Sequence, residues 1–205
     1  MDSDDVRRQW AQRTGEYSPA YYAHYGPDDT SESVREILDR FVDRDGPVLE
    51  LGCSSGRHLA HLHDHGYEDL AGIEVNDDAV DVMGESFPEL AAAGTFYIDA
   101  IEDLVGEFED DQFDAVYSVE TLQHVHPDAG WVFAELARIT ADLLVTVENE
   151  GDSPETTVSY VNDEFPLYHR DWNRVFTDLG LVEVESGEGA RERDTVRAFR
   201  VPSAR

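Results

Sequence analysis

The stretch Pro47-Val48-Leu49-Glu50-Leu51-Gly52-Cys53-Ser54-Ser55-Gly56 decides the fold of this chain. Its first five residues form a short apolar run, which is typical of a buried strand, and a glycine-rich turn follows. Residues 57–65 then have the spacing of a helix, and Gly66 provides a C-terminal stop. A strand, a glycine-rich turn and a helix in this order predict the first unit of an α/β fold.

The alternation of strands and helices continues along the chain. We expect strands at residues 70–75, 95–98, 113–119 and 143–147, helices at 31–42, 77–87, 129–139 and 171–179, and a loop or short helix at 101–108. Two further strands, at residues 181–185 and 195–201, are expected to form a C-terminal antiparallel hairpin. The pattern predicts an α/β fold with a doubly wound, mostly parallel seven-stranded sheet and helices on both faces.

The length of 205 residues suits a single domain. Within it we expect an N-terminal helical or lid segment over residues 1–45, a cofactor-binding core over 46–150, and substrate-side and closing strands over 151–205. The N-terminus lacks the apolar run of a signal peptide, and Cys53 is the only cysteine. We therefore expect a cytoplasmic protein without a membrane span, acting as a monomer or homodimer.

The charge balance is strongly acidic. Asp and Glu number 46 against 15 basic residues, all of them arginine, for a formal net charge of -31. Salt eases such self-repulsion, because the Debye length shrinks to ~3 Å at 1 M. We interpret the composition as adaptation to a salt-rich cytoplasm in a halophilic organism, since the acidic residues are spread along the chain instead of forming one surface for a basic partner. No nucleic-acid partner is expected, because no Lys/Arg cluster is present.

The glycine-rich turn and two acidic residues place a candidate site at the carboxyl ends of the strands. Gly52 lets the backbone turn tightly, the helix that starts near Ser55 or Gly56 offers free amide groups, and Ser54 could cap that helix. Glu74 ends the second strand, where a carboxylate can accept hydrogen bonds from ribose hydroxyls, and Asp99 follows the third. A glycine-rich turn alone would also fit a dinucleotide-binding enzyme.

Four motifs in register carry a more specific resemblance. VLELGCSSG at 48–56, GIEVND at 72–77, IDAIEDL at 98–104 and FDAVYSVETLQHV at 113–125 resemble the motifs of class I, Rossmann-like S-adenosylmethionine-dependent methyltransferases of the small-molecule type. The resemblance runs from about Val48 to Val147. It implies S-adenosyl-L-methionine as cofactor and S-adenosyl-L-homocysteine as product. Ser54 stands where the family often has a glycine, but it is small and its neighbouring glycines are kept.

The resemblance also implies roles for individual residues. Glu50 would orient the methionine amino group, Glu74 would bind the ribose, and Asp99 would accept from the adenine amino group. The other implied cofactor contacts are Gly52, Cys53, Ser54 and Gly56 through the backbone, Val75 against adenine, the Ala100 amide at a ring nitrogen, and Val119 and Glu120 at the methionine end.

The sequence says less about the methyl acceptor than about the cofactor. Methyl transfer from a sulfonium is an in-line displacement, so positioning alone can supply much of the catalysis. A base helps when the acceptor is a hydroxyl or a protonated amine, and the candidate catalytic residues are His124 and His169, with His126 nearby. Candidate substrate contacts are Tyr21 and Tyr22 in an aromatic stretch that could act as a lid, and Tyr168, Arg170 and Trp172. Arg170 could hold an anionic acceptor or form a surface ion pair. The acceptor is expected to be a small molecule, methylated on O, N or C.

Two other functions stay open, a catalytically silent S-adenosylmethionine-binding regulator and, less favoured, an NAD-dependent oxidoreductase, which would more often show the full G-x-G-x-x-G. The histidines at 58, 61, 63 and 65 lie on one expected helix, with His61 and His65 one turn apart. A solvated helix face is the favoured interpretation, and no metal is expected.

Overall fold

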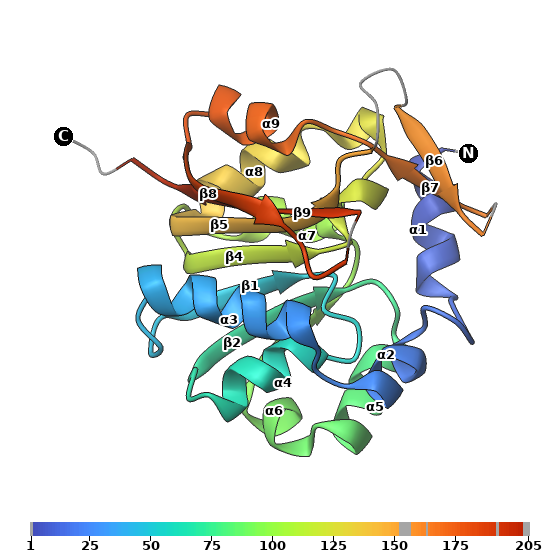
Figure 1. The fold of residues 1–205 in the computed structure, drawn as a ribbon. Coiled ribbons are helices and arrows are strands. Elements are labelled where there is room, and N and C mark those ends of the chain that lie inside the picture. Colours follow the sequence, from blue (N-terminus) through green and yellow to red (C-terminus); the bar gives the residue numbers. More distant parts are fainter. Residues whose placement is uncertain (1, 152–156, 163, 192, 203–205) are drawn as a thin grey trace.

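The computed structural model describes residues 2–151, 157–162, 164–191 and 193–202. Its centre is a seven-stranded sheet in the order β3-β2-β1-β4-β5-β9-β8 (Figure 1). The strands are β1 (Pro47–Leu51), β2 (Asp69–Glu74), β3 (Thr95–Ile98), β4 (Phe113–Val119), β5 (Thr140–Asn149), β8 (Val182–Glu188) and β9 (Asp194–Arg200). Strands β1 to β5 pair in parallel, and β9 is antiparallel to both β5 and β8. The predicted fold class, with its C-terminal hairpin, is confirmed.

Helices cover both faces of the sheet (Figure 1). They are α1 (Ser3–Ala11), α2 (Pro19–Tyr25), α3 (Asp29–Phe41), α4 (Arg57–Asp64), α5 (Asp78–Ser86), α6 (Pro88–Ala93), α7 (Ile101–Leu104), α8 (Val132–Ile139) and α9 (Trp172–Asp178). One apolar cluster packs helices α3, α4, α5 and α6 against one face of the sheet. A second cluster packs α7, α8 and α9 against the other face. This arrangement follows from the central strands, which are buried on both sides as in most parallel sheets.

Helix α3 shows how the sequence sets a helix and its buried face. Asp28 caps the helix by accepting from the amides of Thr30 and Ser31, and the Ser31 hydroxyl completes a capping box with the Asp28 amide. The apolar side chains at Val34 and Leu38 are fully buried, one turn apart. The helix therefore starts two residues before the predicted range, because the cap lies at Asp28.

Several local features differ from the predicted elements. Pro88 starts an unexpected helix, α6, and the predicted helix at 129–139 begins only at Val132, after the short 3₁₀ turn Pro127–Ala129. Both differences arise at prolines, which favour the first position of a helical turn. A separate two-stranded sheet of β6 (Val158–Val161) and β7 (Phe165–Tyr168) was not predicted either.

The strand order creates a crevice at one end of the sheet. From β1 the chain first moves outward through β2 and β3, and then crosses to β4 on the other side of β1. The helices that leave β1 and β4 therefore diverge beyond the carboxyl ends of these two strands. Ligands of open α/β sheets bind at such a switch point.

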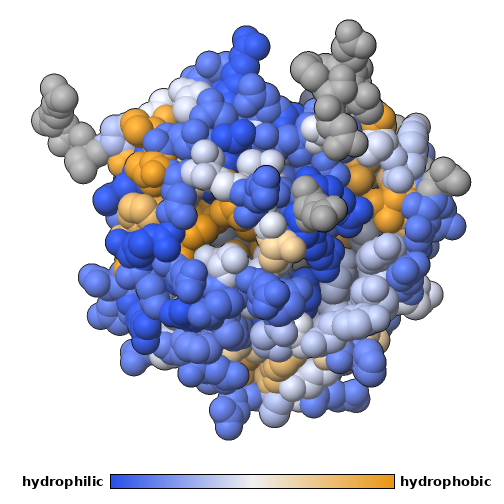
Figure 2. All heavy atoms as spheres, viewed as in Figure 1, coloured by the Kyte–Doolittle hydropathy of each residue, from blue (hydrophilic) through white to orange (hydrophobic). Residues whose placement is uncertain are grey.

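The surface is predominantly hydrophilic, as Figure 2 shows for one face, with apolar side chains gathered at a few places. Among the described residues, the structure contains no helix long and apolar enough to cross a membrane.

Candidate functional site

A cavity lies at the switch point, beyond the carboxyl ends of β1, β2 and β4. Its empty volume, including open solvent at its mouth, is about 1060 Å³. Four parts of the chain line it: the N-terminal segment (Val6, Arg7, Trp10, Arg13, Tyr17, Pro19, Tyr22), the β1 turn with the start of α4 (Glu50, Gly52, Cys53, Ser54, Arg57, His58), the ends of β2 and β3 (Ile73, Glu74, Val75, Asn76, Asp99, Ala100, Ile101, Glu102) and the residues after β4 (Val119, Glu120, Thr121, His124, Val125).

The turn after β1 has a strained backbone that brings it close to the cavity. Gly52, Ser54 and Gly56 have φ values of 69°, 51° and 77°. A Cβ on Gly52 would lie 2.9 Å from the Cβ of Thr121 and would overlap the rest of that side chain. Gly52 therefore permits both the left-handed conformation and the close approach of the turn that follows β4.

The start of α4 corrects one prediction about this turn. Ser54 does not cap the helix, because the cap position is Gly56, and no side chain satisfies the cap there. Gly56 itself does not line the cavity; a Cβ at this position would meet the side chains of Met83 and Leu90. The free amides at the helix start remain available to a ligand.

Glu74 ties the β1 turn to the loop after β2. Its carboxylate accepts hydrogen bonds from the backbone amides of Ser54, Val75 and Asn76, each at 2.8 Å. Burial raises the pKa of Glu74, and the three amides oppose this shift by stabilising the charged form. Three of the roughly four lone-pair directions of the carboxylate are therefore in use, and one is left for a ligand.

Asp99 and Ala100, which the resemblance assigns to the adenine, lie together on the cavity wall. The Ala100 amide donates to Asp99 Oδ1 at 2.8 Å. This amide, which the resemblance assigned to a ring nitrogen, is thus engaged by its own neighbour. A ligand would have to share or replace that contact.

Glu50 places a second buried carboxylate in the cavity. Its side chain is 1% exposed, and its Oε2 accepts from the Tyr117 hydroxyl at 3.0 Å. Burial raises the pKa of Glu50 well above its usual value, and the nearby charge of Glu74 adds to this shift, while the Tyr117 hydroxyl and the positive charge of Arg57 oppose it. A carboxyl group in this situation gains stability from a bound cation, which would restore its charged form.

The turn after β4 is held by a third buried carboxylate, Glu148 on β5. It accepts from the amides of Thr121, Leu122 and Gln123 at 3.0–3.2 Å and from the Ser118 hydroxyl. Burial raises the pKa of Glu148 to about 7. These bonds fix the 3₁₀ turn Leu122–His124 against the cavity.

Glu120, in the same turn, forms the rim of the cavity. It is in the left-handed region, with φ of 49°, and pairs with Arg191 and, at 2.9 Å, with Arg193. The loop between β8 and β9 therefore reaches the cavity mouth through ion pairs.

The N-terminal segment closes the other side of the cavity. Asn76, directly after the Glu74 loop, donates through Nδ2 to the carbonyl groups of Trp10 at 3.3 Å and Arg13 at 3.1 Å. The Trp10 ring packs against His124 and Phe165, with centroid distances of 4.6 Å to each. Segments far apart in sequence thus meet over the cavity.

His124 is the candidate base that lines the cavity. Its Nδ1 lies 3.0 Å from the Pro166 carbonyl oxygen, which can only accept, so Nδ1 carries the proton. Burial lowers the pKa of His124 to about 4, and the ring is therefore neutral at pH 7. In this tautomer Nε2 holds a free lone pair, as a general base requires.

The other candidate base and most candidate substrate contacts lie outside the cavity lining. His169 Nε2 pairs with Ser159 Oγ at 2.7 Å, and Trp172 is fully buried in the core. Of the aromatic pair, Tyr22 lines the cavity and Tyr21 does not. Tyr168 is buried and packs against His126, at a ring distance of 5.4 Å.

Arg170 is held by backbone carbonyl groups of the protein. Its guanidinium donates to the carbonyl groups of Leu122, Tyr168 and Val125 and lies 5.1 Å from the Phe133 ring centroid. The cation is thereby enclosed by the turn after β4, so neither an exposed ion pair nor a contact with a ligand in this cavity describes it.

Some cavity residues were not singled out from the sequence. Trp10 and Arg13 belong to no motif, and Asn76 and Thr121 lie within two of the motifs without a role assigned to them. Their places in the cavity depend on how the N-terminal segment docks and how the turn after β4 approaches Gly52. The regular spacing of apolar residues contains no information on either contact.

Comparisons with known proteins show what the chain resembles. Residues 48–142 match the family described as "Methyltransferase domain". Geranyl diphosphate C-methyltransferase from Streptomyces coelicolor A3(2), solved with Mg²⁺, geranyl diphosphate and S-adenosyl-L-homocysteine, has a TM-score of 0.72 at 16% identity, over 97% of this chain and 97% of that one. Magnesium protoporphyrin IX methyltransferase from Synechocystis PCC 6803, with bound S-adenosylhomocysteine, has a TM-score of 0.67 at 16% identity, over 97% and 98%.

The same fold also occurs in the [4+2]-cyclase SpnF, with a TM-score of 0.68 at 13% identity over 87% of both chains. Similarity at this level shows the fold. Residues 48–142, a little under half of the chain, are similar to a methyltransferase domain. This similarity indicates an enzyme, and S-adenosylmethionine is the cofactor that it and the fold indicate.

Proposed function

We propose that this enzyme transfers the methyl group of S-adenosylmethionine to a small molecule by in-line displacement. The observation that carries the proposal is the pair of buried carboxylates, Glu50 and Glu74, in one cavity at the switch point of the sheet. Because Glu50 is buried beside a second acid, it favours a cationic partner, and the methionine amino group is such a cation. Glu74 has one acceptor direction left for a ribose hydroxyl.

The proposed donor site follows the cavity wall. The methionine end lies at Gly52, Val119 and Glu120, and the adenine end at Val75, Asp99 and Ala100. Cys53 and Ser54 line the turn between these ends. In this arrangement the sulfonium faces the part of the cavity formed by the N-terminal segment and the turn after β4.

The proposed acceptor site is the aromatic end of the cavity. Trp10, Tyr17 and Tyr22 line it from the N-terminal segment and His124 from the turn after β4, and the aromatic side chains favour an acceptor with an apolar or planar part. The N-terminal segment, in this proposal, acts as a lid that excludes water from the transfer. The atom that receives the methyl group decides whether His124 takes a proton.

The single-domain organisation and the salt-rich cytoplasm are also part of the proposal. Ion pairs such as Arg197 with Glu150 at 2.6 Å engage many of the arginines, while the acidic residues remain in large excess. Dissolved salt screens the repulsion between these acidic side chains.

Calorimetry tests the donor assignment. We expect binding of S-adenosylmethionine and S-adenosylhomocysteine but not of NAD, with stronger binding in molar NaCl than in dilute buffer, where self-repulsion opposes the folded state. NAD binding without the other two would contradict the proposal. Incubation with methyl-labelled donor and a metabolite extract should then give a labelled small molecule; cofactor binding with no transfer would favour the silent regulator.

The variant His124→Gln tests the proposed base. Between pH 6.5, the ordinary pKa, and about 4, the unfolded chain binds more protons at this residue than the folded chain does. The free energy of unfolding is therefore unaffected by this residue above pH 6.5. It falls, by at most about 3 kcal/mol, as the pH drops from 6.5 to about 4. We expect the free energy of unfolding of the variant to fall less between pH 7 and pH 4.5 than that of the unaltered chain, as measured by urea unfolding.

The same variant should lose turnover by ~100-fold or more where the reaction uses a base. Unchanged turnover would remove His124 from the chemistry.

A further inference from the structure

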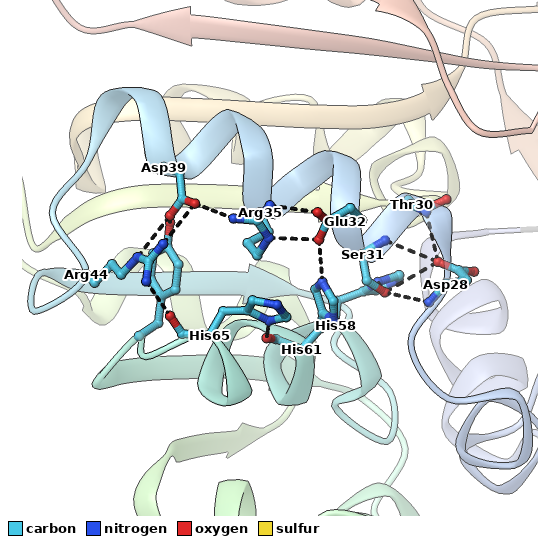
Figure 3. Close-up of polar contacts among 11 residues, drawn as sticks. Asp28, Thr30, Ser31, Glu32, Arg35, Asp39, Arg44, His58, His61 and His65 are labelled. Atoms are coloured by element: carbon cyan, nitrogen blue, oxygen red, sulfur yellow. Dashed lines mark hydrogen bonds and ion pairs between the residues drawn. The ribbon is translucent and has the colours of Figure 1, made fainter.

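A cluster of possible metal ligands lies between α3 and α4, outside the cavity lining (Figure 3). Glu32 on α3, His61 on α4 and His65, the residue directly after α4, each offer one ligand atom, and these atoms lie within 4.8 Å of one another. His61 Nε2 is 2.8 Å from Glu32 Oε2, and the two imidazole rings are 4.4 Å apart. Two histidines one helical turn apart, with a carboxylate from a neighbouring helix, provide three ligands on one side of an ion.

The protonation of His65 suits a metal ligand. Its Nδ1 lies 2.7 Å from the His61 carbonyl oxygen, which can only accept, so Nδ1 is the donor. In the neutral ring, Nε2 then carries the lone pair. Metal-binding histidines commonly donate their other ring N–H to a backbone carbonyl or a carboxylate in this way, because the contact fixes both the tautomer and the direction of the ring.

The carboxylate of Glu32 is also held in place. Arg35 donates to both of its oxygens, with Nε at 2.8 Å and Nη2 at 2.7 Å. The positive charge of Arg35 would repel a metal ion, but Asp39 pairs with the same guanidinium and offsets this repulsion. The two bonds from Arg35 therefore hold the Glu32 carboxylate in place beside His61.

We propose that Glu32, His61 and His65 bind a divalent transition-metal ion such as Zn²⁺, with water completing a tetrahedral site. Imidazole nitrogens favour such ions over Mg²⁺ or Ca²⁺. The ion takes the place of the proton between His61 Nε2 and Glu32 Oε2, and that proton leaves to solvent. Glu32 keeps its bond from Arg35 through Oε1.

The site would extend a polar contact that already joins the two helices. Ser31 pairs with His58 at 2.7 Å, one turn closer to the cavity (Figure 3). Asp28 pairs with Arg57 at 2.6 Å. Arg57 and His58 line the cavity. A metal ion at the next turn would therefore fasten α3 to the helix that follows the cofactor turn.

The competing interpretation is an ion pair on a solvated helix face, as the sequence alone favoured. It accounts for Glu32 and His61, but it gives His65 no role beyond its own helix. The structure adds Glu32, which lies 29 residues before His61 in the chain and has no spacing that would reveal it.

The test uses the full chain, free of any histidine tag and treated with a chelator. Co²⁺ is titrated while its visible absorption is followed, and Zn²⁺ is then added as a competitor. We expect His65→Gln and Glu32→Gln each to weaken Co²⁺ binding by at least ~10–100-fold. His63→Gln is the matched control, because it removes an imidazole from the same helix outside the cluster, and its affinity should equal that of the unaltered chain.

Thermal unfolding gives a second measurement that does not depend on methyl transfer. Zn²⁺ should raise the unfolding temperature of the unaltered chain and of His63→Gln, but not that of His65→Gln, because only binding to the folded state stabilises it. Equal Co²⁺ affinity in His65→Gln and the unaltered chain would overturn the proposal, and so would a comparable loss in His63→Gln.

Discussion

Replacement of Glu74 by glutamine is expected to weaken the binding of S-adenosylmethionine by at least about 100-fold. The carboxylate accepts from the amides of Ser54, Val75 and Asn76, and glutamine would turn an NH₂ group toward at least one of these donors. Hydrogen bonds to a charged group contribute ~1.5–3 kcal/mol each, and ~2.7 kcal/mol corresponds to the expected loss. The effect is large because one side chain shapes both the cofactor turn and the adjoining loop.

Calorimetric titration of the cofactor measures this loss, with circular dichroism to establish that the variant is folded. Asp77→Asn is the matched control, because it removes an exposed carboxylate three residues away and should leave the affinity unchanged. A Glu74→Gln chain that binds as tightly as the unaltered chain would show that the donor does not lie against this turn.

Gly52→Ala is expected to abolish cofactor binding and to lower the free energy of unfolding by about 2–4 kcal/mol. Two costs combine: an alanine in the left-handed region at φ of 69°, and a new Cβ that overlaps the Thr121 side chain. The turn after β1 and the turn after β4 cannot both keep their positions, so the methionine end of the proposed donor site would be displaced.

Urea unfolding and cofactor titration measure the two effects separately. Gly180→Ala is the control for backbone strain alone, because Gly180 has φ of 97° but no atom within 4 Å of an added Cβ. Its unfolding free energy should fall by only about 1–2 kcal/mol, with cofactor affinity unchanged. A Gly52→Ala chain that resembled Gly180→Ala in both measurements would contradict the steric argument.

The central part of the fold could be predicted because its signals are local. Continuous apolar runs such as Val48–Leu51 mark strands buried on both faces, and their alternation with helices fixes a parallel sheet. Since parallel strands end at the same edge, residues such as Glu74 and Asp99 could be placed beside the Gly52 turn without any knowledge of the packing. Their specific roles stay predictions.

The acceptor side could not be placed in the same way, because it depends on long-range docking. Trp10 reaches the cavity through contacts with residues 76, 124 and 165, and none of these pairings leaves a periodic signal. Trp172 looked like a wall of the site from its position in the chain, but it fills the core between α8 and α9 instead.

The hydrogen bonds from Asn76 to the Trp10 and Arg13 carbonyls give the two ends of the cavity a thermodynamic connection. The loop that Glu74 organises is the same loop that anchors the N-terminal segment, so a ligand that tightens one also favours the docked state of the other. Any such coupling is reciprocal: the factor by which a bound donor changes the affinity for the acceptor equals the factor by which the acceptor changes the affinity for the donor.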